Sequence, residues 1–161
     1  MESRAKLLGH PIHPMLIVLP LGLFIAAVVF DALHLFFGSA TFAAVGFWNI
    51  AAGIIGGLLA AVFGLIDWLA IPQGTRAKRI GLLHGASNVV VVAAFSFVWL
   101  MRRDAIDFAP STAVFLIELV ALGLGSIAGW LGGELVDRLA VGVDDGAHLN
   151  APSSLSGKPA A

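Results

Sequence analysis

Four apolar stretches, each about 20 residues or longer, make up most of this 161-residue chain. A helix needs about 20 residues to cross the roughly 30 Å hydrocarbon core of a bilayer. The mean hydropathy is +0.97 and only 12% of the residues are charged, a composition typical of membrane proteins rather than soluble domains. The stretches predict four transmembrane helices, at about residues 14–37, 42–71, 80–101 and 111–135.

The predicted fold class is all-α: a polytopic membrane protein whose four transmembrane helices form a bundle with short loops. Short connections favour antiparallel packing of consecutive helices. The transmembrane domain covers residues 1–143. Residues 144–161 are polar, small and proline-containing, which predicts a flexible tail.

The basic residues are divided unequally between the two sides of these helices. Seven fall on the side of the termini and two, Arg102 and Arg103, on the other. By the positive-inside rule, both termini are predicted to be cytoplasmic. The seven are Arg4, Lys6, Arg76, Lys78, Arg79, Arg138 and Lys158.

The composition excludes several classes of function. The chain has no cysteine, which excludes disulfides, thiolate zinc sites, cysteine-ligated iron–sulfur clusters and covalent c-type haem. The net charge is −1 with scattered basic residues, so nucleic acid is not an expected partner. No hydrolytic motif is present, which favours an electron-transfer or metal-binding protein over a substrate-converting enzyme.

Five ionisable residues are predicted to share one leaflet, near the side of the termini. Ionisable groups within spans are costly unless they have partners, so each is a functional candidate. Asn88 lies one turn deeper than one of the histidines, on the same helix face. Two alternatives involve no functional site: the histidines near the membrane surface are hydrated at the headgroups, and Asp67 forms an ion pair with Arg76 or His84. The five are His10, His13, Asp67, His84 and Glu134.

Smaller polar features lie in the other half of the predicted bundle. Asp31 and His34, one turn apart, are predicted to form a local ion pair. Asn49 and Glu118 are predicted to hydrogen-bond between helices.

The sequence also hints at an internal repeat. A histidine at the start of one helix precedes an acid at the end of the next, first as His13 and Asp67 and again as His84 and Glu134. A parallel repeat would place its symmetry axis along the membrane normal. His13 and His84 would then lie on opposite sides of a shared centre.

Three motifs resemble the DUF2231 family of predicted bacterial membrane proteins: "GHPIHPMLIVLPLGL", "GLIDWLAIPQGTRAKRIGLLHGASN" and "GWLGGELVDRLAVGV". The resemblance covers about residues 7–143. It implies a multi-pass protein of the bacterial inner (cytoplasmic) membrane. Some relatives look to be fused to Rieske-type or cytochrome c domains, which implies a link to electron transfer.

The leading functional hypothesis is a b-type haem protein with His13 and His84 as axial ligands and His10 as a possible substitute. Small residues would leave room for the macrocycle, and arginines would meet the propionates. The residues in these two roles are Gly64, Gly81, Gly85 and Gly129, and Arg4, Arg76 and Arg79.

Three alternatives remain open at this stage. The histidines with Asp67 or Glu134 would suit a non-haem ion such as Fe, Cu or Zn. The same groups would suit a proton or ion path, and the chain would also suit a structural subunit. The expected partners are membrane lipid, a redox partner protein and a second copy of the chain, because the 19 glycines favour close helix packing in a bundle or homodimer.

Overall fold

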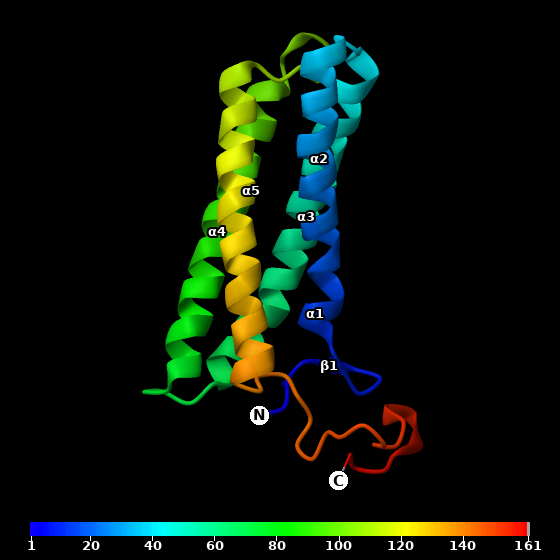
Figure 1. The fold of residues 1–161 in the computed structure, drawn as a ribbon, viewed down its shortest axis with the longest axis vertical. Helices are drawn as coiled ribbons and strands as arrows, with labels where there is room; N and C mark the ends of the chain where they lie inside the picture. The colour runs from blue at the N-terminus through cyan, green and yellow to red at the C-terminus, as the bar shows by residue number, and fades with distance from the viewer. Residues whose placement is uncertain (161) are drawn as a thin grey trace.

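A computed structural model describes residues 1–160 and contains four long helices packed side by side (Figure 1). The first span comprises α1 (Ile12–Leu16) and α2 (Val18–Phe37), and the others are α3 (Ala40–Ala70), α4 (Arg76–Arg102) and α5 (Thr112–Gly133). All four are long and apolar enough to cross a membrane. The predicted all-α bundle with four candidate spans is confirmed.

Short elements complete the fold. A hairpin of β1 (Lys6–Leu7) and β2 (His10–Pro11) precedes α1. One turn, η1 (Ile106–Phe108), joins α4 to α5, another, η2 (Glu134–Arg138), extends α5, and η3 (Ser154–Ser156) lies in the tail.

The sequence explains where the helices begin, end and break. Pro20 has no N–H to donate to the carbonyl four residues earlier, which accounts for the interruption of the first span at Ile17. Gly38 ends α2 in the left-handed conformation (φ 68°), which suits a residue without Cβ. The Thr75 hydroxyl caps α4 by accepting from the Lys78 N–H at 3.1 Å.

The four spans form a square bundle. Helix α2 packs against α3 and α5, and α4 packs against the same two helices, so α2 and α4 lie diagonally across the bundle axis. Both termini lie at one end, here called the terminal end, and the α2–α3 and α4–α5 connections lie at the other, the loop end (Figure 1).

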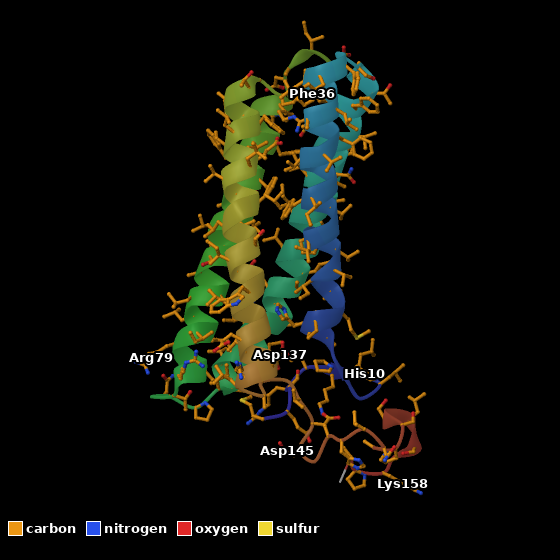
Figure 2. All side chains as sticks on the ribbon, viewed as in Figure 1. His10, Phe36, Arg79, Asp137, Asp145 and Lys158 are labelled. Carbon is orange, nitrogen blue, oxygen red and sulfur yellow. The ribbon has the colours of Figure 1, made fainter. Side chains whose placement is uncertain are left out.

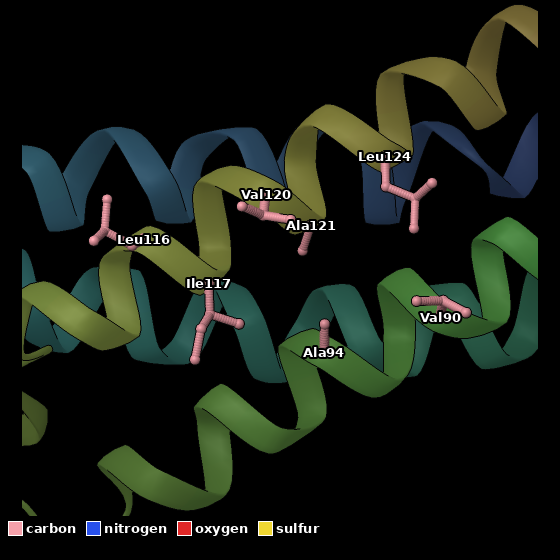
Figure 3. Close-up of a pocket in the computed structure, with 7 residues that line it drawn as sticks. All are labelled: Val90, Ala94, Leu116, Ile117, Val120, Ala121 and Leu124. Carbon is pink, nitrogen blue, oxygen red and sulfur yellow. The ribbon is translucent and has the colours of Figure 1, made fainter.

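The outer surface of the bundle is apolar, as a lipid-facing surface requires. Leu58, Val89 and Val120 are 57%, 66% and 74% exposed. A groove of about 300 Å³ between α4 and α5 is lined only by apolar side chains (Figure 3). Figure 2 shows Arg79 and Asp137 at the terminal end, where polar groups gather.

Candidate functional site

His13 and His84 face each other inside the bundle near its terminal end. One lies on α1 and the other on α4, so they come from diagonally opposite spans. Their ring centroids are 6.2 Å apart and the ring planes are nearly perpendicular, at 85°. The structure therefore brings together the two histidines that the repeat predicted to share a centre.

Each imidazole is held by the same kind of contact. Nδ1 of His13 lies 2.8 Å from the Ala60 carbonyl oxygen of α3, and Nδ1 of His84 lies 2.8 Å from the Ala128 carbonyl oxygen of α5. A carbonyl oxygen only accepts hydrogen bonds, so Nδ1 carries the hydrogen in both rings. In the neutral state the lone pair is then on Nε2, the arrangement usual for metal-ligating histidines.

Glycines one turn after these carbonyls make the approach possible. A Cβ on Gly64 would lie 2.9 Å from Cε1 of His13, and a Cβ on Gly132 would lie 3.1 Å from Cε1 of His84. The absence of a side chain at these two glycines therefore makes room for the imidazole rings. Asn88 adds a contact to one ring only, since its Nδ2 donates to the His84 backbone carbonyl at 2.9 Å and lies 3.3 Å from His84 Nε2.

The two halves of the chain are related by a pseudo-twofold axis along the bundle. Within each half a histidine on the first span contacts a carbonyl of the second, with a glycine one turn later. Three pairs of residues at an offset of 71 positions meet across this axis: His13 with His84, Phe24 with Phe95, and Asp31 with Arg102. The phenylalanine rings stack at 4.0 Å between centroids with planes 2° apart. These matching contacts agree with the predicted parallel repeat, although its acids, Asp67 and Glu134, do not meet in this way.

The other predicted ligands lie apart from the histidine pair. His10 is exposed, with Nε2 3.4 Å from the Ser154 hydroxyl of the tail (Figure 2). The Asp67 carboxylate accepts from the Ser3 hydroxyl and the Arg4 N–H, each at 2.8 Å. Glu134 pairs with Arg76 at 2.5 Å. Within residues 1–160, no three His, Asp or Glu side chains converge in a way that would hold a metal ion.

The glycines predicted to leave room for the macrocycle are of two kinds. Beside some of them a neighbouring side chain fills the space, and beside others the space is open. The Trp68 indole occupies the space beside Gly81, and the His13 ring occupies the space beside Gly64. A Cβ on Gly85 or Gly129 would have no heavy atom within 4 Å. Arg79 is exposed at the terminal end.

A second polar cluster, which sequence reasoning missed, is buried at the loop end. Asp31, Arg102 and Glu118 are 0%, 1% and 0% exposed. Arg102 donates from Nη1 to Asp31 Oδ2 at 2.6 Å and from Nη2 to Asp31 Oδ1 at 2.7 Å. Nη1 also donates to Glu118 Oε1 at 3.2 Å.

This cluster corrects one prediction and gives Arg102 a role that the charge count did not indicate. The sequence placed Arg102 only on the side opposite the termini, and in the structure it is buried and donates to groups of α2, α3 and α5. Asp31 pairs with Arg102 instead of His34, whose Nδ1 contacts the Ser39 carbonyl at 2.9 Å. The interhelical hydrogen bond predicted for Glu118 is confirmed, whereas the Asn49 side chain makes no hydrogen bond within residues 1–160. The internal repeat could have predicted that Asp31 and Arg102 meet, because Arg102 follows His84 by the same interval as Asp31 follows His13.

These features define a class: an integral membrane protein built as a four-helix bundle from two related halves, with an imidazole pair on its axis. The chain belongs to the DUF2231 family of predicted membrane proteins, whose model matches residues 9–145. The comparisons with curated proteins and with solved structures gave no match.

Proposed function

We propose that this protein is a membrane electron-transfer protein in which His13 and His84 are the axial ligands of a b-type haem. The observation that supports the proposal best is the facing pair of imidazoles, each fixed through Nδ1 to a backbone carbonyl at 2.8 Å. This contact orients the ring, and it leaves Nε2 as the ligating atom.

The separation of the rings fits two ligands on one centre. Metal–imidazole bonds of about 2 Å, with ring centres about 1 Å beyond each nitrogen, place two opposed ring centroids about 6 Å apart. The observed separation is 6.2 Å. Equivalent positions on a pseudo-twofold axis suit a centre that is bound from two opposite sides.

The number of ligands favours haem over a bare ion. Haem supplies its own equatorial nitrogens, so two protein ligands complete the coordination of its iron. Protein sites for Zn, Cu or non-haem Fe generally use three or four side chains. Only two histidines converge here among the residues that the structure describes.

Other residues suit the periphery of such a group. Arg4, Arg76 and Arg79 lie at the terminal end, where they would meet carboxylates at the membrane surface. A bis-histidine haem stores one electron and offers no free position for substrate, which is why we expect a redox partner and no substrate conversion.

The test is the visible spectrum of protein purified from haem-replete cells, with and without dithionite. We expect a Soret band and sharp reduced α and β bands, abolished by His13→Ala and by His84→Ala. His10→Ala and His148→Ala are the matched controls, since both side chains are exposed away from the pair, and each should leave the spectrum unchanged.

Other outcomes would contradict the proposal. Stoichiometric metal without a Soret band would favour a non-haem ion at the same pair, and neither haem nor metal would favour the ion-path or structural alternatives. A spectrum that survives His84→Ala would refute the assignment of the ligands.

A further inference from the structure

The buried cluster at the loop end carries an excess of negative charge. Asp31 and Glu118 supply two carboxylates, and Arg102 supplies one guanidinium. All three side chains are at most 1% exposed. An uncompensated charge in so dry an environment costs several kcal/mol, so one more positive charge is required.

Arg102 has no capacity to compensate both acids. Its five N–H groups make five hydrogen bonds, two of them to Asp31 in a bidentate pair and one to Glu118. The remaining two donate to the carbonyl oxygens of Ala43 at 3.0 Å and Phe108 at 2.9 Å. The geometry assigns the guanidinium chiefly to Asp31, with the weaker contact left for Glu118.

Glu118 therefore has one oxygen to spare. Its Oε2 is buried and receives no hydrogen bond from a donor among residues 1–160, and the Asp31 carboxylate is within hydrogen-bond reach of the Glu118 carboxyl group. An ionised carboxylate oxygen in that position would lose its hydration without compensation, whereas a protonated carboxyl group is neutral. We propose that Glu118 binds one exchangeable proton, so that the loop-end cluster is a proton-binding site of net charge zero.

The charged and titratable neighbours support a proton on Glu118. On α2, His34 lies one turn from Asp31 and contacts Ser39. On α3, the groups facing the cluster are the Ala43 carbonyl and Gly46, where a Cβ would overlap the Asp31 carboxylate. Beyond α4, Arg103 and Asp104 are exposed and pair with each other. None of these contacts Glu118 Oε2.

The α4–α5 connection separates this site from the aqueous phase. The Phe108 carbonyl accepts from Arg102, and the Phe108 ring stacks on Phe47 with centroids 4.3 Å apart. Asp107 and Phe108 both have positive φ, 55° and 57°, a conformation that is strained for residues other than glycine. Opening of this turn gives water access, and the proton then exchanges with the medium on the loop-end side.

The test is infrared spectroscopy of the purified protein in nanodiscs, which detects the C=O stretch of a protonated carboxylic acid directly. We expect one such band per chain at neutral pH, shifted in D₂O because the proton exchanges. Glu118→Gln should remove it. Glu134→Gln and His34→Gln, which alter groups outside the cluster's hydrogen bonds, should retain it.

Stability gives a second readout that needs no spectroscopic assignment. Glu118→Gln mimics the neutral side chain, so its melting temperature should be no lower than that of the wild type. Asp31→Asn leaves Arg102 without its bidentate partner and should melt lower or fail to accumulate. Absence of the band in the wild type, or its persistence in Glu118→Gln, would overturn the proposal. A melting temperature that rises with Na⁺ while the band is absent would overturn it in favour of a bound cation.

Discussion

The glycines beside the histidine pair allow a stringent test of the site, because each substitution to alanine changes one methyl group. In Gly64→Ala the new Cβ would lie 2.9 Å from both Cε1 and Nδ1 of His13, closer than real Cβ contacts. The ring must move, and its 2.8 Å hydrogen bond to Ala60 is disrupted with it. In Gly132→Ala the closest approach is 3.1 Å, to Cε1 of His84, so a shift of a few tenths of an ångström relieves it.

Gly85→Ala is the matched control. It lies in the same membrane half, and its Cβ would have no heavy atom within 4 Å. All three substitutions share the gain in helix propensity of up to about 1 kcal/mol, so the difference between Gly64→Ala and Gly85→Ala isolates the steric effect. Overpacking typically costs about 1–3 kcal/mol, which for a chain of this size corresponds to roughly 2–12 °C in melting temperature.

The assay is thermal unfolding of the purified variants in one detergent, followed by tryptophan fluorescence. We expect the melting temperatures to fall in the order Gly85→Ala, Gly132→Ala, Gly64→Ala. If haem is bound, the Soret band should weaken in the same order. A Gly64→Ala protein as stable as Gly85→Ala, with an unchanged spectrum, would show that His13 is not confined by α3.

Two further predictions concern the ends of the molecule. Both termini are expected to be cytoplasmic, so in this cysteine-free chain Leu155→Cys should be labelled only from the cytoplasmic side and Ile106→Cys only from the opposite side; the reverse pattern would refute the orientation. The Lys6 ammonium lowers the pKa of Glu2, and the carboxylates of Asp144 and Glu2 raise the pKa of Lys6. When folding lowers the pKa of a carboxyl group, its ionised form stabilises the contact that the group makes at pH values above the ordinary pKa. This stabilisation is lost as the pH falls through the lowered pKa. Acid should therefore release the tail from the N-terminal segment, seen as increased mobility of a spin label at position 155, while a label at position 106 stays unchanged.

The fold was predictable because in a membrane the hydrophobic pattern is nearly sufficient. Uninterrupted apolar stretches and short loops determine the number of helices and their antiparallel order. The ends of the helices were less predictable. Helix α4 begins at Arg76, before its apolar part, because Thr75 caps it at the membrane surface and Lys78 donates to the Trp68 carbonyl of α3 at 2.7 Å.

The candidate site was predictable only in part, because the sequence indicates how deep a residue lies along its helix but not which neighbour its side chain faces. Depth along a helix follows from sequence, so His13 and His84 could be placed at one level. The rotation of each helix about its own axis depends on packing. In the structure Asp67 contacts Ser3 and Glu134 contacts Arg76, and neither acid contacts the histidines. For the same reason the burial of Arg102 was not predictable. A count of basic residues treats Arg102 and Arg103 alike, although Arg102 is buried and Arg103 is exposed.

The pseudo-twofold axis explains why the loop-end cluster has its composition. At two levels the residues that meet on the axis are identical, histidine with histidine and phenylalanine with phenylalanine. Identical ionisable residues at the third level would place two like charges within hydrogen-bond distance in a dry interior. The chain has Asp31 and Arg102 there instead, which attract each other. Two identical hairpins could not form this pair on their axis. Joining both halves in one chain permits their sequences to differ at that level, and the asymmetry lets Glu118 of the second half approach Arg102. The third level is thus where the two halves have diverged in charge, and it is the level at which a proton is required.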